Sequence, residues 1–330
     1  MIIPEDSDFH ERDTTDRTWA ETTVLLFSVP EAGIIGNAYV LARPNLGVAT
    51  SAVIIAQGFC RQPFEVDFTD PQVHQPCPDN FSNYTLPSGL SVEVTKPPVD
   101  YHFTYEHALG AASFDLTFTG LSQPFDIHDK NQNPLLADQM FDSLGDQWKN
   151  GHFELLGHVQ GELQLRGKTY KIDSFEGMDH SWGPRLEEGR RALSWMPIAF
   201  GEDLGMHIVT ALDIVDGRVV YGDLRFGHVV DHGEVYGLVE ARIEADHVDL
   251  IGVRNHVYAR DVRGKEYDFY GTSLGGHPYH QFNPCSVAYQ SLFRYDLNGR
   301  IGHGVGTDVY GLDFLADRMS RHGRQRGGTR

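Results

Sequence analysis

Five chemically active side-chain types stand close together near the middle of the chain, in Asp179-His180-Ser181-Trp182-Gly183-Pro184-Arg185. The stretch offers a carboxyl, an imidazole, a hydroxyl, an indole and a guanidinium. A carboxyl or imidazole in apolar surroundings can act as a general acid or base. The flanking glycines and Pro184 favour a loop over a helix, and loops anchored on strands often carry functional side chains. We therefore expect acid/base chemistry at this loop.

A purely structural interpretation of the same stretch stays open. In that interpretation Asp179 accepts backbone N–H bonds in a buried turn, Trp182 fills a hole and Arg185 neutralises Asp179. Ion-pair networks of this kind perturb titration as readily as catalytic sites do. The sequence alone does not separate the two interpretations.

His152 and Glu154 form a second candidate acid/base pair. Residues two apart on a strand point to the same face, so the two side chains would lie together if this segment is extended. Such a pair can relay a proton. A histidine hydrogen-bonded to a neighbouring carboxylate at the rim of a barrel would give the same pattern.

Three other motifs argue weakly for different chemistry. Gly271-Thr272-Ser273-Leu274-Gly275 matches the spacing of a serine-hydrolase elbow, but the following His277 and Pro278 do not start a helix. His277 and His280 lack a nearby carboxylate ligand in the sequence, and we expect no metal site. Glycines 302, 304 and 306 mimic part of a dinucleotide fingerprint without the helix that must follow, so we expect no nucleotide cofactor.

Composition restricts the partners and the compartment. A formal net charge of −19 argues against nucleic acids and anionic membranes, because both bind a basic face. Three cysteines without a CxxC pair do not predict a disulfide framework. The first residues lack a signal peptide, and no apolar run is long enough for an integral membrane segment. We expect a cytoplasmic protein; the oligomeric state stays open, with a homodimer as one possibility.

Alternating apolar and polar residues predict an all-β chain. Period-two runs at 22–27, 36–42, 48–56, 101–105, 114–118 and 153–165 are separated by compositions typical of turns. A long surface loop is expected over 61–83, and one short helix over Pro134–Leu144. The 35 glycines, above the usual share, fit a protein built from tight turns and coiled strands.

The second half of the chain predicts an antiparallel meander. Strand pairs flank Asp216-Gly217, Arg263-Gly264 and Asn298-Gly299, and Xaa-Gly turns of this type connect hairpins. A meander that closes on itself is a barrel. The arginine-rich end of the chain predicts one or two helical turns followed by disorder.

The stretch 179–185, preceded by Gly151-His152-Phe153-Glu154 and a glycine-rich strand pair, resembles the carotenoid 1,2-hydratase (hydroxyneurosporene synthase)-like superfamily, to which kievitone hydratase and fungal decalin-forming Diels–Alderases are related. The resemblance implies two lipocalin-like β-barrels side by side, a hydrophobic ligand within or between them, and no organic cofactor. We expect 1–186 to form the first barrel, 187–315 the second, and 316–330 a basic disordered tail. Ser181 departs from the Asn that the carotenoid enzymes tend to carry, so the substrate does not transfer.

The resemblance directs the acid/base chemistry to a hydrophobic unsaturated substrate. We expect a lyase, as hydratase or dehydratase, or an isomerase of a terpenoid, steroid or prenylated aromatic. Asp179 is the expected proton donor and His180 the base or alternative donor; the expected pocket residues are His152, Glu154, Trp182, Arg185, Trp195 and Tyr105. If Arg185 pairs with Asp179, His180 must be the acid or the reaction is not a hydration. A cyclase that works by folding a polyene, and a ligand carrier without chemistry, are the alternatives.

Overall fold

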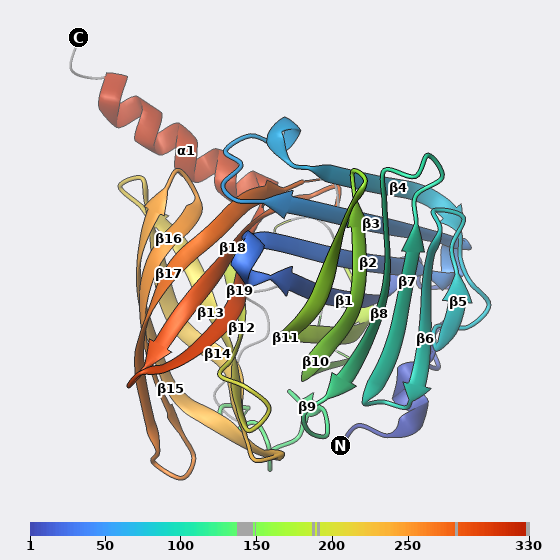
Figure 1. Ribbon diagram of the computed structural model, residues 1–330, viewed down its shortest axis with the longest axis horizontal. Helices are drawn as coiled ribbons and strands as arrows, with labels where there is room; N and C mark the ends of the chain where they lie inside the picture. Colours follow the sequence, from blue (N-terminus) through green and yellow to red (C-terminus); the bar gives the residue numbers. More distant parts are fainter. Residues whose placement is uncertain (137–147, 149, 187–188, 190–191, 281–282, 328–330) are drawn as a thin grey trace.

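The protein is described here from a computed structural model, in which residues 1–136, 148, 150–186, 189, 192–280 and 283–327 are placed. These residues form two β-sheets that lie side by side, with a helix projecting from the second sheet (Figure 1). The predictions of an all-β chain and of two lipocalin-like barrels are confirmed. None of the helices among these residues is long and apolar enough to cross a membrane.

The first sheet contains 11 strands and carries the stretch 179–185. Its strands are β1 (Trp19–Val29), β2 (Ile34–Arg43), β3 (Val48–Gln57), β4 (Phe68–Pro76), β5 (Asn83–Thr85), β6 (Leu90–Lys96), β7 (Asp100–Glu106), β8 (Ala112–Gly120), β9 (Phe125–Asp126), β10 (Gly151–Leu165) and β11 (Lys168–Pro184). The strand order is β4-β3-β2-β1-β11-β10-β8-β7-β6-β5, with β9 beside β10. The sheet curls but stays open between β4 and β5, and β11 lies in its middle.

The second sheet is a closed barrel of eight strands in sequence order. They are β12 (Ala192–Ala199), β13 (Leu204–Val215), β14 (Arg218–Asp231), β15 (Glu234–Val248), β16 (Ile251–Asp261), β17 (Glu266–Tyr279), β18 (Ser286–Leu297) and β19 (Arg300–Gly311). The three predicted hairpins of this half are all present. At Asp216-Gly217 and Asn298-Gly299 both turn residues have positive φ, which is the conformation that the Xaa-Gly pair predicts.

Short helical segments complete the described chain. They are the 3-10 turns η1 (Pro4–Ser7), η2 (Pro30–Ala32), η3 (Pro44–Leu46) and η4 (Pro63–Glu65), and the α-helix α1 (Leu312–Gly327). Helix α1 is longer than the one or two turns expected before a disordered tail. Phe314 and Leu315 pack against the base of the barrel, and Arg318 donates hydrogen bonds of 2.6 and 3.0 Å to the Asp213 carboxylate, so two kinds of contact hold the helix start.

One local prediction from the sequence does not hold, and a second lies largely outside the described residues. The segment 61–83, expected to be a loop, contains η4 and the edge strand β4, whose alternation the prolines obscure. An edge strand tolerates proline because one side of its backbone has no partner. The helix expected over Pro134–Leu144 lies largely outside the described residues.

The stretch 177–184 is strand, not loop, which corrects the central expectation from the sequence. It is the second half of β11 and pairs with β10 on one side and β1 on the other. The glycines suggested a loop, but here they allow neighbours to approach. A Cβ atom on Gly177 would lie 2.7 Å from Pro197 and 2.9 Å from the Trp195 ring of β12, so glycine lets the second barrel contact this strand closely.

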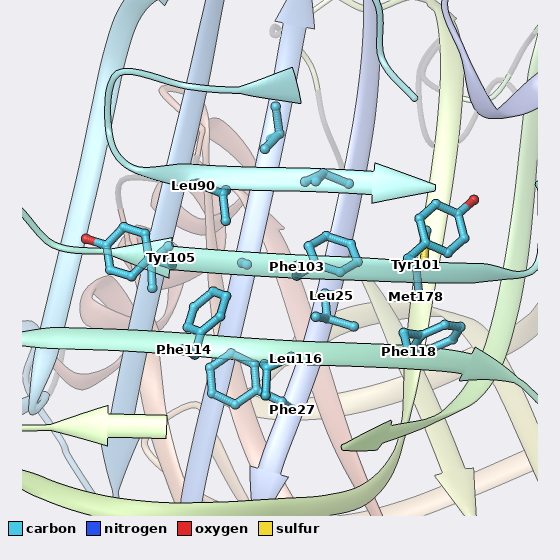
Figure 2. Close-up of a cluster of buried hydrophobic side chains, with 14 of the residues drawn as sticks. Leu25, Phe27, Leu90, Tyr101, Phe103, Tyr105, Phe114, Leu116, Phe118 and Met178 are labelled. Atoms are coloured by element: carbon cyan, nitrogen blue, oxygen red, sulfur yellow. The ribbon is translucent and has the colours of Figure 1, made fainter. Parts of the chain in front are cut away.

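Each barrel has its own apolar core, and a third core joins them. The first core is rich in aromatic side chains from β7 and β8, which face Leu25, Phe27 and Met178 (Figure 2). The joining core combines Leu26 and Phe125 of the first sheet with Val209 and Phe226 of the second, all fully or almost fully buried. Burial of these side chains holds β1 and β9 of the first sheet against the closed barrel.

Candidate active site

A cavity of about 120 Å³ lies between the two sheets. Side chains from β1, β2 and β11 form one wall, and side chains from β12, β17, β18 and β19 form the other. Its apolar and aromatic lining consists mainly of Val24, Tyr39, Trp148, Leu193, Trp195 and Tyr279. Its charged lining groups among the described residues are Asp179 and Arg185, so the cavity combines aromatic faces with few titratable groups.

Asp179 faces the cavity from β11, directly opposite Glu154 of β10. Its side chain stays partly accessible on the cavity side. Burial raises the pKa of Asp179 well above its usual value, and the neighbouring Glu154 raises it further, while Arg185 acts in the opposite direction. A neutral Asp179 in an apolar cavity is a proton donor.

Glu154 lies directly behind Asp179 and is fully buried. One oxygen of each carboxyl lies within 4.8 Å of the other. The Trp195 indole donates to both Glu154 oxygens at 2.9 and 3.1 Å, and His152 Nε2 lies 2.6 Å from Oε1. Burial raises the pKa of Glu154, opposed by His152 and by the Trp195 hydrogen bond. Two carboxyls so close do not both ionise readily, so the pair holds a proton.

Two histidines, His152 and His207, lie against Glu154. Burial lowers the pKa of His152 despite the adjacent carboxylate, and it lowers the pKa of His207 to about 3. His207 Nδ1 lies 3.0 Å from Glu154 Oε2. Two imidazoles and two carboxyls therefore lie together at the cavity wall.

Arg185 holds the polar end of the cavity. Its Nη2 donates to Ser181 Oγ at 2.7 Å, and its Nη1 donates to the Tyr39 hydroxyl at 3.3 Å. Ser181 in turn shares a 2.7 Å hydrogen bond with Thr22 of β1. Although the Arg185 charge lowers the pKa of Asp179, burial and Glu154 outweigh it, so the conflict foreseen between Arg185 and a neutral Asp179 resolves towards the neutral acid.

His180 and Trp182 do not reach this cavity. Because alternate residues of a strand point to opposite faces, they face the interior of the first barrel when Asp179 and Ser181 face the cavity. His180 packs with Phe153 at 5.4 Å between ring centroids, and Trp182 stacks on His10 at 3.7 Å. The sequence grouped these side chains as one loop, whereas the strand separates them.

Of the predicted site residues, Asp179, Arg185 and Trp195 line the cavity, and His152 and Glu154 lie directly behind Asp179. Tyr105 lies elsewhere, in the first core, where its hydroxyl donates to Asp70 at 2.6 Å. His207 and the cavity residues Tyr39 and Tyr279 were not foreseen. The lone polar residue in the apolar run Met206-His207-Ile208 was the available signal for His207.

Two groups of side chains among the described residues bring enough donor atoms together to hold a metal ion. One is His152, Glu154 and Asp179 at the cavity; the other is His10, Glu21 and His180 inside the first barrel. In the cavity group the raised pKa of Asp179 and the bonds that already engage both Glu154 oxygens favour proton transfer over metal ligation.

Comparison with known proteins relates the chain to a family and to two solved structures. The family model "Domain of unknown function (DUF7064)" matches residues 3–307. An AttH-like protein from Nitrosomonas europaea superposes with a TM-score of 0.58 at 10% identity, covering 90% of this chain and 93% of that one. Kievitone hydratase from Nectria haematococca superposes with a TM-score of 0.52 at 10% identity, covering 94% and 93%. No curated protein matches by sequence. The resemblance to the carotenoid hydratase-like proteins is confirmed as a shared fold.

Proposed function

We propose that this chain, which belongs to the family "Domain of unknown function (DUF7064)", is a lyase of the hydratase or dehydratase type, or an isomerase, that acts on a carbon–carbon double bond of a hydrophobic substrate. The observation that carries the proposal is Asp179, a carboxyl with a raised pKa on the wall of a cavity lined by aromatic rings. The shared fold with a protein named a hydratase supports the same class of reaction.

In the proposed hydration, Asp179 donates its proton to one alkene carbon and forms a C–H bond. The positive charge that develops on the other carbon faces the Trp195 indole. A cation–π contact contributes roughly 0.5 to 2 kcal/mol. Water then forms the C–O bond, and its surplus proton returns to the pair of Asp179 and Glu154. Dehydration is the same path in reverse.

Arg185 has a positioning role in this proposal. A guanidinium near a developing carbocation would oppose it, so Arg185 must lie at the far, polar end of the substrate. Its hydrogen bonds to Ser181 and Tyr39 hold it at that end. Glu154 keeps the proton on Asp179 before reaction, because two adjacent carboxylates repel each other.

The size of the cavity restricts the substrate. At about 120 Å³ it is smaller than the cavity of roughly 150 Å³ that takes up benzene. It therefore fits the reacting end of a substrate better than a complete steroid nucleus. Among the predicted substrate classes this favours terpenoid chains and prenylated aromatics that enter with a terminal double bond.

The test is turnover in D₂O of a panel of prenylated phenols and linear isoprenoid alcohols, followed by mass spectrometry. Hydration by the proposed path places one deuterium on carbon. Asp179→Asn removes the donor, and the rate should fall by roughly 10²- to 10⁴-fold, while the melting temperature stays within a degree or two. Asp173→Asn is the matched control, because Asp173 lies on the same strand with an exposed side chain.

The other outcomes distinguish the alternatives. A cyclised product without deuterium, formed equally well by Asp179→Asn, would support a cyclase that works by folding its substrate. Recovery of every panel compound unchanged, with a bound ligand found in the purified protein, would support a carrier. Either result contradicts the proposed acid catalysis.

A further inference from the structure

A cluster of two histidines and one glutamate lies on the opposite face of β11 from the cavity. It consists of His10, from the segment after η1, Glu21 of β1 and His180 of β11. The proposed reaction uses none of these three residues. Glu21 is completely buried, and His180 is almost so. A carboxylate and two imidazoles in such a place require partners.

The two imidazoles converge on the same oxygen of Glu21. His10 Nδ1 lies 2.9 Å from Glu21 Oε2, and His180 Nε2 lies 3.7 Å from that atom. Two ligands bound to a tetrahedral ion at 2.0 to 2.1 Å lie about 3.3 Å apart. The two observed separations bracket that value, so small side-chain adjustments would place an ion between the three donors.

The other oxygen of Glu21 is already held. Oε1 accepts the backbone N–H of His10 at 3.0 Å and the indole N–H of Trp19 at 3.1 Å. These bonds fix the carboxylate with Oε2 directed at the imidazoles. His180 Nε2, by contrast, is buried and has no hydrogen-bond partner among the residues that the structure describes. A buried imidazole nitrogen that lies 3.7 Å from a carboxylate oxygen, too far for a hydrogen bond, is placed to share an ion with it.

The second nitrogen of each ring has an oxygen nearby. His10 Nε2 lies 3.4 Å from the Asp6 carboxylate, and His180 Nδ1 lies 3.4 Å from Thr23 Oγ1. Metal-bound histidines usually place their second ring nitrogen beside a carboxylate or another acceptor, which orients the ring. Stacking of His10 on Trp182, at 3.7 Å and 8°, restricts the ring further.

We propose that His10, Glu21 and His180 bind a divalent transition-metal ion. Two imidazoles and one carboxylate are the donor set of several zinc sites that keep a fourth position for water, and imidazole also suits copper, nickel and iron. Zinc fits best, since it accepts tetrahedral geometry without redox chemistry. The ion would fasten the segment around His10 to β1 and β11, behind the cavity wall that carries Asp179.

The spacing of the ligands explains why the sequence did not predict this site. Residues 10, 21 and 180 come from three separate segments, and no ligand pair has the short spacing of a metal motif. Only the register of β1 and β11, in which Thr23 lies opposite His180 and Glu21 opposite Trp182, brings the groups together.

The test uses the complete protein, stripped with a chelator and then titrated with ZnCl₂. Metal per chain is measured by mass spectrometry after gel filtration, together with the melting temperature. We expect one Zn²⁺ per chain and a melting temperature several degrees higher with the ion. His10→Gln and His180→Gln should each weaken Zn²⁺ binding by 100-fold or more. His10 lies outside the strands, so its variant tests the site even if substitutions within the barrel prevent folding.

Two matched variants separate this site from other histidines. His152→Gln removes an imidazole from the cavity group, and His102→Gln removes one from the outer surface of the same sheet, beside Asp115. Both should bind zinc as the unchanged protein does. Co²⁺ substituted for Zn²⁺ should show the absorption bands of a tetrahedral site, and these should vanish in His180→Gln. Absence of Zn²⁺ binding, binding that survives both His10→Gln and His180→Gln, or binding lost only in His152→Gln would overturn the proposal.

Discussion

The surroundings of Asp179 and Glu154 raise the pKa values of both carboxyls. A carboxyl is normally ionised at neutral pH, but burial disfavours the charged form of both groups, and each disfavours the charge of the other. The Trp195 N–H and His152 bond to Glu154, whereas the exposed side of Asp179 meets the cavity. This asymmetry favours Asp179, which faces the cavity, as the proton donor of the pair.

Another buried carboxyl, Glu176, permits a separate test at the scale of one residue. Its side chain accepts a hydrogen bond from the Ser28 hydroxyl where β1 and β11 separate. Burial raises the pKa of Glu176 to about 7, which the hydrogen bonds from Ser28 and Ser174 oppose. It lies apart from the cavity residues, so substitutions there report on stability.

Glu176→Gln is expected to change the pH dependence of unfolding. The folded protein holds the Glu176 proton more tightly than the unfolded chain, so this group contributes most stability below pH 4.5 and loses it as pH rises to about 7. At about 1.4 kcal/mol per pH unit the loss is about 3 kcal/mol. Between pH 5 and pH 8, urea unfolding of Glu176→Gln should show a decline in stability that is smaller than the decline of the unchanged protein by about this amount. Glu162→Gln, an exposed control on β10, should keep the decline. Equal pH profiles for all three proteins would contradict the prediction.

At the scale of the element, strand β11 shows why the sequence predicted the site residues but not their separation onto two faces. Its alternation sends Asp179 and Ser181 to the cavity and His180 and Trp182 to the first barrel. Local composition suggested a loop, because Gly177 and Gly183 are turn formers in isolation. Their role is to admit neighbouring side chains, which no local pattern reveals.

The hairpins were predictable because their signals are local. The alternating apolar residues on either side of Asn298-Gly299 indicate the two strands, and the Asn-Gly pair itself indicates the turn type. The contact of Asp179 with Glu154 depends instead on the register of β10 against β11, and the contact of Trp195 with Glu154 depends on how two sheets pack. Contacts between segments that are far apart in the chain leave no periodic pattern in the sequence. The site was therefore predicted only in part.

Gly177→Ala tests whether close contact between β11 and β12 holds the site together. The added methyl group would lie 2.7 Å from Pro197 and 2.9 Å from Trp195, so one strand must move. We expect a loss of about 1 to 3 kcal/mol in unfolding free energy, as for other overpacked sites, and reduced turnover because Trp195 shifts from Glu154. Chemical denaturation measures the first effect.

The matched control for this substitution is Gly222→Ala in β14. There the new methyl group would meet Ala211 at 3.4 Å, which is ordinary contact, and the unfolding free energy should stay within about 0.5 kcal/mol of the starting protein. A Gly177→Ala variant as stable and as active as Gly222→Ala would show that the two strands do not need this proximity.

At the scale of the whole molecule, the two sheets differ in whether each strand is hydrogen-bonded to a neighbouring strand on both sides. The second sheet closes on itself through β12 and β19, whereas the first ends in the unpaired edges of β4 and β5. The cavity and the joining core lie on the contact between the two. The candidate site therefore exists only where an open sheet is held against a closed barrel.

This difference predicts how the separated halves behave. Strands β12 to β19 form a closed barrel with an apolar core of its own, and we expect the fragment 187–330 to fold alone and to melt cooperatively. Residues 1–186 would expose the joining-core face of an open sheet, so we expect them to aggregate or remain partly unfolded. Circular dichroism and thermal melting of each fragment measure this directly.

Mixing the fragments is the control, because the closed barrel covers the exposed face and should restore a soluble complex. A fragment 1–186 that melts cooperatively by itself, at the temperature of the complete chain, would mean that the first barrel does not depend on the second.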